Sequence, residues 1–573
     1  MAQHTAAHYF IEGLRDLGVE FIFSNLGTDH APLIEELARH EAEGDVRLRP
    51  ILCPHESLAV HMALGYGALT GRGQVVLVHV DAGSANAALG LHNAFRSRMP
   101  VLLIAGRAPF TSHGELLGGR DNYVHFIQEP YDQASLVRPF IKWEADLPSG
   151  VVAKEMLRRA YSLMSSDPPG PAYMSLRRET LTQSWDSADI ADFPDSDYGA
   201  CRLGGADPDQ IERVVERLLA ARSPLLITSY AGRNPAAADA LARFATLAGV
   251  RVVEANAQRL NIARNHPCFA GFNAGDALPD TDLGILMDVD VPWIPADVGP
   301  AAGSHWIQID VDPIKRDLPL WPYAVHQRIA ADSSHVLEQL CAALESRRDA
   351  AFTARAAQRV ASLAEQARAR REAAAALAKR VGSAPGTVSA HHLCAAVARQ
   401  MDDDAILINE AVRSSGIVAT QIPRTRAGTY FHNGGGGLGW SAGVALGAKL
   451  ACPRRDVVRI VGDGTFYLGN PTSFFAAARQ YELPTLTVVL DNGGWAAVKS
   501  ATERVYPDGY AHRANQFQAV LPAGVDFSQV AQAAGAYGVT IDDPAQVEAA
   551  VSSCFEQIRA GRSALLHARI AAL

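Results

Sequence analysis

The sequence predicts an α/β protein of three domains, each built on a parallel sheet flanked by helices. Apolar, β-branched runs such as GQVVLVHV (73–80), SPLLITS (223–229) and DVVRIVGDG (456–464) alternate with amphipathic helical stretches along the 573 residues. Strands that are apolar on both faces are typical of parallel sheets covered by helices on each side. A chain of this length has room for roughly two to four such domains.

Two segments interrupt the alternation and divide the chain. Ser184–Ala200 is acidic and without apolar pattern, so we interpret it as a linker. Residues 350–386 are rich in strong helix formers but lack a wide apolar face, which indicates a helical linker on the surface. The predicted units are therefore an N-terminal domain at 1–185, a Rossmann-like middle domain at 203–345, the helical linker at 350–386 and a C-terminal domain at 387–573.

Composition and charge exclude several classes of protein. The formal net charge is −9, and both signs are scattered along the chain, which excludes the basic face that nucleic acid requires. No run of roughly 18 apolar residues and no signal peptide is recognisable. The seven cysteines are widely spaced without a C-x-x-C pair, which argues against a zinc ribbon or a disulfide framework. We therefore expect a cytoplasmic protein that contacts neither membrane nor nucleic acid.

Two of the predicted strands are followed by short segments that contain glycines and side chains with oxygen atoms. Gly-Asp-Gly-Thr (462–465) follows the first strand, and Asp-Asn-Gly-Gly (491–494) follows the second. If the strands are neighbours, carboxylate, amide and carbonyl oxygens meet at one edge of the sheet, where ligands of parallel sheets bind. Such oxygens suit Mg²⁺ or Ca²⁺ rather than zinc, and glycines let the backbone approach a phosphate. Each tip alone is more commonly an ordinary turn, but the pair predicts a magnesium diphosphate site.

The pair resembles the thiamine diphosphate-binding signature, in which GDG is followed some two dozen residues later by two asparagines. Here 26 residues separate Gly464 from Asp491, and Asp491 replaces the first asparagine. The resemblance implies three ligands for Mg²⁺, for which Ca²⁺ or Mn²⁺ can substitute: Asp463, Asn492 and the Gly494 carbonyl. It places Gly464, Thr465 and Trp495 beside the cofactor, with the Thr465 hydroxyl and a helix N-terminus available as donors.

The glycine run GGGGLG (434–439) allows two interpretations. It satisfies G-x-G-x-x-G, but a dinucleotide site also requires an acid about twenty residues later, and Asp456 fits that place only loosely. The surrounding segment instead resembles the family's GGLG segment. That resemblance implies that Leu438 wedges the cofactor into its bent form and that the Gly436 carbonyl accepts a hydrogen bond from it.

The segment CPHESLAVHMALGYGALTGRG (53–73) resembles the helix that supplies the family's catalytic glutamate. Taken alone, Glu56 is most simply a capping or surface acid near a helix start. The resemblance implies instead that Glu56 binds and activates the cofactor across a subunit interface. The expected assembly is a homodimer or homotetramer with active sites between chains.

The resemblance covers nearly the whole chain and is strongest to benzoylformate decarboxylases and acetolactate synthases. It implies that the N-terminal domain binds the pyrimidine and the C-terminal domain the diphosphate, that His79 shuttles protons, and that Asp29 contacts the substrate. We expect a lyase that cleaves, and as a carboligase also forms, the bond next to the carbonyl of a 2-oxo acid.

The alternatives are an acetolactate synthase-like transferase, a 2-hydroxyacyl-CoA lyase and a non-catalytic nucleotide-binding paralogue. Trp293 stands where the decarboxylases have a second catalytic histidine, and Ala497 and Ala501 replace two large residues of the synthases. The sequence leaves open which oxo acid is used and whether the middle domain binds FAD.

Overall fold

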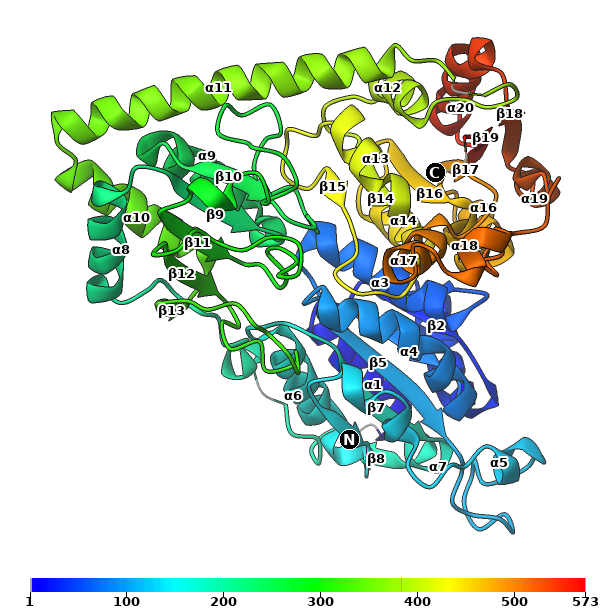
Figure 1. The fold of residues 1–573 in the computed structure, drawn as a ribbon. Coiled ribbons are helices and arrows are strands. Elements are labelled where there is room, and N and C mark those ends of the chain that lie inside the picture. Colours follow the sequence, from blue (N-terminus) through cyan, green and yellow to red (C-terminus); the bar gives the residue numbers. More distant parts are fainter. Residues whose placement is uncertain (1–2, 193, 383, 572–573) are drawn as a thin grey trace.

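The computed structural model describes residues 3–192, 194–382 and 384–571 and contains three parallel sheets, one in each third of the chain. Figure 1 shows the N-terminal sheet at the bottom, the middle sheet at the left and the C-terminal sheet at the upper right, each covered by helices. The predicted α/β class with several helix-flanked parallel sheets is confirmed. No helix among the described residues is long and apolar enough to cross a membrane.

The N-terminal sheet has the strand order β3-β2-β4-β5-β7-β6 and is parallel throughout. Its strands are β2 (Phe21–Asn25), β3 (Arg49–Leu52), β4 (Gln74–Val78), β5 (Val101–Arg107), β6 (Glu144–Asp146) and β7 (Ala172–Arg177). Its main helices are α1 (Ala6–Asp16), α2 (Ala31–Ala42), α3 (Glu56–Thr70), α4 (Asp81–Arg96) and α6 (Ala153–Ser165), with the short α5 (Val124–Ile127) and α7 (Arg178–Thr182). All five residues of β4 are buried, as a strand covered on both faces requires.

The middle sheet has five parallel strands in the order β10-β9-β11-β12-β13. They are β9 (Pro224–Thr228), β10 (Arg251–Glu254), β11 (Leu283–Met287), β12 (His305–Asp310) and β13 (Gln327–Ala330), flanked by α8 (Pro208–Ala220), α9 (Pro235–Ala248) and α10 (Ser333–Arg347). The Arg98 guanidinium of the N-terminal third lies 2.7 Å from the Asp290 carboxylate after β11. The Lys315 ammonium, fully buried, lies 2.8 Å from the same carboxylate. These buried charges tie the middle sheet to the N-terminal third.

The C-terminal sheet repeats the topology of the N-terminal one, with the order β15-β14-β16-β17-β19-β18. Its strands are β14 (Ile406–Glu410), β15 (Tyr430–Phe431), β16 (Val457–Gly462), β17 (Leu486–Asp491), β18 (Tyr537–Ile541) and β19 (Ala564–Arg569). Its helices are α12 (Ala390–Gln400), α13 (Ser415–Gln421), α14 (Trp440–Ala451), α15 (Asp463–Leu468), α16 (Pro471–Gln480), α17 (Ala496–Val505), α18 (Tyr510–Ala514), α19 (Phe527–Ala533) and α20 (Val547–Arg559). The strand order reverses between β14 and β16, and such a switch point leaves a crevice at the carboxyl ends of the strands.

Helices α3 and α14 pack against each other and join the N-terminal and C-terminal sheets (Figure 1). Small residues allow the approach: a Cβ on Gly65 would lie 2.3 Å from the Val444 carbonyl oxygen, and one on Gly447 would lie 2.1 Å from that of Met62. Both helices are buried on nearly every face. This contact fixes the first residues of α3 relative to the glycine run before α14.

The two predicted linkers differ in outcome. Helix α11 (Ala350–Ala378) occupies most of segment 350–386 and runs along the top of the molecule from the middle sheet to the C-terminal one (Figure 1). The predicted linker Ser184–Ala200 is wrong in its first residues, because Ser184–Asp186 form β8, which pairs antiparallel with β1 (Gln3–Thr5). That pairing uses backbone groups and leaves no apolar pattern in the sequence. The exact domain boundaries stay a prediction.

Candidate active site

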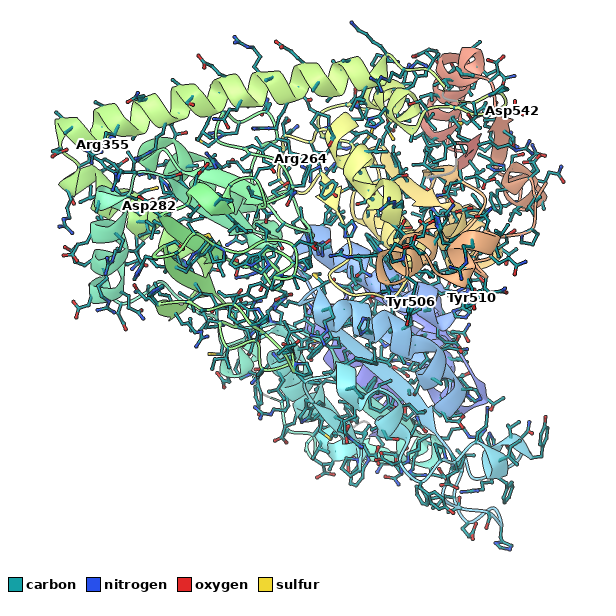
Figure 2. All side chains as sticks on the ribbon, viewed as in Figure 1. Arg264, Asp282, Arg355, Tyr506, Tyr510 and Asp542 are labelled. Atoms are coloured by element: carbon teal, nitrogen blue, oxygen red, sulfur yellow. The ribbon has the colours of Figure 1, made fainter. Side chains whose placement is uncertain are left out.

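A cavity of about 340 Å³ lies at the switch point of the C-terminal sheet. Its walls come from the segments that follow β14, β16 and β17, together with Leu438 before α14 and the first turn of α17. Figure 2 shows Tyr506 and Tyr510 near α17 and α18, at the lower edge of the C-terminal third beside the N-terminal one. Seven predicted site residues line this one cavity: Leu438, Asp463, Gly464, Thr465, Asn492, Gly494 and Trp495. The structure therefore brings together residues that are up to 57 positions apart.

The Asp463 carboxylate is the buried anion of this cavity. It is 3% exposed, and its Oδ1 accepts a hydrogen bond of 2.9 Å from the Gly464 N–H. Its Oδ2 is buried and has no hydrogen-bond partner among the described residues. Burial, and then the neighbouring Asp491 carboxylate, raise the pKa of Asp463 to about 6. A buried carboxylate oxygen without a donor fits a divalent cation.

Asp491, where the resemblance would place asparagine, adds a second carboxylate. The ring Nε2 of the fully buried His567 lies 2.8 Å from its Oδ2, and the Gly493 N–H donates to its Oδ1 at 2.9 Å. Burial pushes the pKa of Asp491 upward, but the hydrogen bonds from His567 and the Gly493 N–H, together with the charge of His567, outweigh it and hold the pKa below its ordinary value. Asp491 therefore stays ionised beside Asp463 and makes this edge of the sheet more anionic.

Gly464 and Trp495 both line the cavity and pack against each other. A Cβ on Gly464 would lie 2.4 Å from the Trp495 ring nitrogen, so only glycine leaves room there. The backbone of Trp495 is held by a hydrogen bond of 2.7 Å to the Ala519 carbonyl. The Asn492 side-chain oxygen accepts the Gly494 N–H at 3.2 Å. The two strand tips are thus preformed with their oxygens at the cavity.

Thr465 lines the cavity, and its predicted role toward the cofactor stays a prediction. Its hydroxyl donates to the Gly462 carbonyl at 2.8 Å. Its backbone N–H lies in the first turn of α15, where it is part of the helix N-terminus.

Leu438 is held by two buried residues that the sequence analysis did not single out. The fully buried Asn93 of α4 accepts the Gly437 N–H at 3.1 Å and donates to the Gly437 carbonyl at 2.9 Å. Glu410, at the end of β14, accepts the N–H groups of Gly439 at 2.6 Å and Ser441 at 3.1 Å, and burial raises its pKa to about 7. Both residues fix the backbone on either side of Leu438.

Gly436 does not line the cavity with Leu438. It is exposed, and its N–H donates to the ring Nε2 of His92 at 3.1 Å. Its predicted carbonyl contact to the cofactor stays a prediction.

Glu56, Asp29 and His79 lie in the N-terminal third, and none of them lines the cavity. Glu56 begins α3, is 9% exposed, and accepts a hydrogen bond of 3.1 Å from the side-chain amide of Asn86. The Asp29 carboxylate accepts a hydrogen bond from His79 Nδ1, and the Gln128 side-chain oxygen lies 3.0 Å from His79 Nε2. Within one chain, the predicted acid thus lies outside the cavity that the predicted metal ligands line.

Asp29 and His79 shift each other's pKa. Burial pushes the pKa of Asp29 upward, but His30 and His79 outweigh it and hold that pKa below its ordinary value. The hydrogen bond to Asp29 is the main reason why the pKa of His79 is raised, against the effect of its partial burial. A histidine of raised pKa is well placed to give and take protons near neutral pH.

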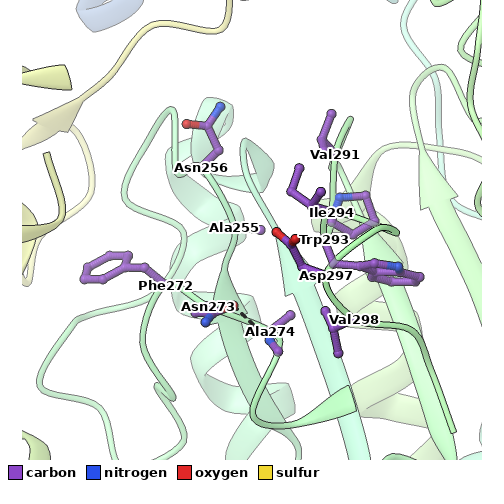
Figure 3. A pocket seen from close by; sticks show the side chains of 12 residues that line it. Ala255, Asn256, Phe272, Asn273, Ala274, Val291, Trp293, Ile294, Asp297 and Val298 are labelled. Atoms are coloured by element: carbon purple, nitrogen blue, oxygen red, sulfur yellow. Dashed lines mark hydrogen bonds between the residues drawn. The ribbon is translucent and has the colours of Figure 1, made fainter. Parts of the chain in front are cut away.

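A second cavity, of about 720 Å³, lies at the carboxyl ends of β10 and β11 in the middle sheet (Figure 3). Its walls include Asn256, Phe272, Trp293 and Ile294, and Asp297 is the one charged residue among the twelve that line it. The described lining thus offers no cationic side chain to the diphosphate of a flavin or other dinucleotide.

Comparison with known proteins identifies the chain. The profile of the thiamine pyrophosphate enzyme N-terminal TPP binding domain matches residues 4–136, and that of the C-terminal TPP binding domain matches residues 412–568. The chain belongs to the thiamine pyrophosphate enzyme family. The predicted membership is confirmed, and the two matched domains indicate thiamine diphosphate as cofactor.

Curated relatives place this thiamine pyrophosphate enzyme in the group that contains 2-oxo acid decarboxylases and acetolactate synthases. It is 27% identical over 513 residues to benzoylformate decarboxylase of Pseudomonas aeruginosa, covering 87% of each chain. It is 25% identical to acetolactate synthase isozyme 3 large subunit of Escherichia coli, covering 98% of this chain and 94% of the other. A solved structure, the thiamine diphosphate-dependent 4-hydroxybenzoylformate decarboxylase of Rhodococcus jostii, superposes over 100% of both chains with a TM-score of 0.79 at 22% identity, which shows a shared fold.

Proposed function

We propose that this enzyme decarboxylates a 2-oxo acid, releasing carbon dioxide and an aldehyde, with thiamine diphosphate bound through Mg²⁺. The observation that carries the proposal is the unpartnered, buried Asp463 Oδ2 in a cavity that also contains Leu438, Asn492 and the Gly494 backbone. These oxygens would hold the metal, and the first turn of α15 would receive the diphosphate. When bound, the cofactor supplies a nucleophilic carbon and an electron sink.

The residues of the N-terminal third complete the chemistry. Glu56, nearly buried and fixed by Asn86, would hold the proton that activates the cofactor. His79, paired with Asp29, would deliver a proton to the carbon that loses the carboxylate. The reaction balances as one oxo acid anion plus one proton yielding one aldehyde and one carbon dioxide. Joining the same fragment to a second aldehyde would be a side activity.

Because Glu56 lies outside the cavity that Asp463 lines in one chain, we propose that a second copy supplies Glu56 to each cavity. The test mixes two inactive variants, Glu56→Gln and Asp463→Ala, after refolding or coexpression. Shared sites would restore about one quarter of the wild-type activity in a statistical mixture of dimers, because each mixed dimer keeps one intact site. Sites contained within single chains would give no recovery, which would contradict the shared arrangement.

The alternative is a transferase that joins two 2-oxo acids, because the acetolactate synthase relative matches nearly the whole chain. The small Ala497, which lines the cavity, and Ala501 favour the lyase, because the resemblance places larger residues there in the synthases. The deciding assay incubates the enzyme with thiamine diphosphate, Mg²⁺ and a panel of aromatic, aliphatic and cationic 2-oxo acids. Aldehyde and carbon dioxide support the lyase, whereas acetolactate from pyruvate as the main product supports the transferase.

A further inference from the structure

A third cavity, of about 150 Å³, lies where the loop after β10, helix α11 and helix α13 meet. Figure 2 shows Arg264 beneath α11, between the middle and C-terminal thirds. We call this cavity the arginine pocket, because Arg264, Arg370 and Arg371 line it and none of its described lining residues is acidic. Asn265, Thr420 and Thr425 add neutral polar groups, and Phe269, Phe272 and Pro423 add an apolar wall.

Arg264 is a fixed, buried donor in this pocket. It is 4% exposed, and its Nε lies 3.1 Å from the Glu254 carboxylate. Its guanidinium carbon lies 3.8 Å from the centroid of the Tyr430 ring, which holds the plane of the group. Its Nη2 is buried and has no hydrogen-bond partner among the described residues. An unpartnered donor of this kind is costly unless a ligand or water accepts from it.

Arg370 and Arg371 bring further positive charge to the same place from α11. Arg370 donates to the Phe269 carbonyl, and no ion pair of either arginine occurs within the described part of the chain. Burial, with Arg251 and Arg371 close by, holds the pKa of Arg370 below its ordinary value. Arg371 is exposed at the rim. Like charges gathered in a partly desolvated site are stabilised when an anion binds between them.

We propose that the arginine pocket binds a small oxyanion, a phosphate or carboxylate group, whose remaining atoms lie against the phenylalanine wall. The planar guanidinium group matches both anions because it offers paired donors in a fixed geometry. The volume suits an anionic group with a small apolar body rather than a nucleotide, since sites for larger ligands have roughly 300 Å³ or more. This inference does not depend on the reaction proposed for the enzyme.

The pocket is also placed to stabilise the wall of the active-site cavity. Ala419 and Thr420 of α13 line the arginine pocket, and Val412 and Arg413, just before α13, line the active-site cavity. An anion that joins α11, the middle-domain loop and α13 would therefore stabilise the folded chain where its middle and C-terminal thirds meet.

The experiment titrates the holoenzyme with inorganic phosphate and, separately, with benzoate at low ionic strength, by calorimetry and thermal unfolding. Arg264 is left intact, because its removal would orphan the buried Glu254. The double variant Arg370→Ala/Arg371→Ala should weaken binding at least tenfold, since two charged donors are lost. Stronger binding of benzoate than of phosphate would assign an apolar carboxylate, and the reverse order would assign a phosphate group.

Two further variants make the test specific. Arg368→Ala removes an exposed charge from the same helix outside the pocket and should leave the anion affinity within twofold of wild type. Arg371→Glu places a carboxylate beside Arg370, so it should abolish anion binding and raise the unfolding midpoint measured without added anion. The proposal is overturned if neither anion binds the wild type at millimolar concentration, or if Arg368→Ala weakens binding as much as the double variant does.

Discussion

Asp463→Asn should make the cofactor-free enzyme more stable and at the same time remove its response to cofactor. The pKa of about 6, against an ordinary 3.8, means that ionised Asp463 destabilises the fold at pH 7. Two pKa units correspond to about 3 kcal/mol, and because part of this repulsion is shared with Asp491 we expect a gain of about 2 kcal/mol. Because the pKa of this carboxyl group is raised by folding, the free energy of unfolding falls as the pH rises from about 4 through about 6. The amide side chain of the variant is uncharged, so this loss of stability does not occur, and its NH2 group can donate a hydrogen bond to Asp491.

The assay is thermal unfolding at pH 7 with and without thiamine diphosphate and Mg²⁺. At roughly 1 °C per kcal/mol for a chain of 573 residues, the variant should unfold about 2 °C higher than wild type without ligand. Wild type should gain about 2.7 kcal/mol from cofactor at one hundred times its Kd, and the variant should gain almost nothing. A variant with a lower midpoint without ligand, or with the wild-type gain on adding cofactor, would refute the assignment of Asp463 as the buried metal ligand. At pH 4 the difference between the ligand-free proteins should disappear.

Three further substitutions test the other parts of the site. Glu56→Gln should keep the unfolding midpoint and lower kcat by roughly 10²–10⁴-fold, since the side chain keeps its shape and loses its proton-transfer role; an unchanged kcat would remove Glu56 from the chemistry. Asp29→Asn should move the limb of the pH–rate profile that reports His79 to lower pH, because the hydrogen bond to Asp29 is what raises the pKa of that ring; a limb that stays in place would assign it to another group. Gly439→Ala should cost about 2–5 kcal/mol and weaken cofactor binding, because φ is +89° and the added Cβ would lie 2.3 Å from the Leu468 carbonyl oxygen. Its control is Gly416→Ala in α13, where the added Cβ meets nothing within 4 Å and stability should change by no more than about 1 kcal/mol.

The strand-and-helix pattern was sufficient to predict the parallel sheets, because strands such as β4 and β16 are almost wholly buried and, apart from Gln74, Arg459 and Gly462, consist of apolar residues. A pair of strands that is held only by backbone hydrogen bonds could not be predicted from the sequence. Strand β8 carries the polar sequence Ser-Trp-Asp and is specified by its partner β1, which lies 181 residues earlier in the chain. The packing of α3 on α14 was likewise hidden, since it depends on where glycines meet in space rather than on a local pattern.

The site residues that lie at the ends of strands could be predicted from the sequence. The residues of other elements that hold them in place were harder to predict. Asp463 and Asn492 directly follow the neighbouring strands β16 and β17. The sequence of the two strand ends, with the rule that ligands bind at the carboxyl ends of parallel strands, was therefore enough to place them together. The same rule could have found Glu410, which ends the apolar strand β14, but not Asn93, which reaches Gly437 from a helix of the N-terminal third. Leu438 thus depends on contacts from both thirds, and its position is determined only when α3, α4 and α14 have docked. This dependence predicts that loosening the contact between the N-terminal and C-terminal thirds, for example by Asn93→Ala, should weaken cofactor binding even though residue 93 does not line the cavity.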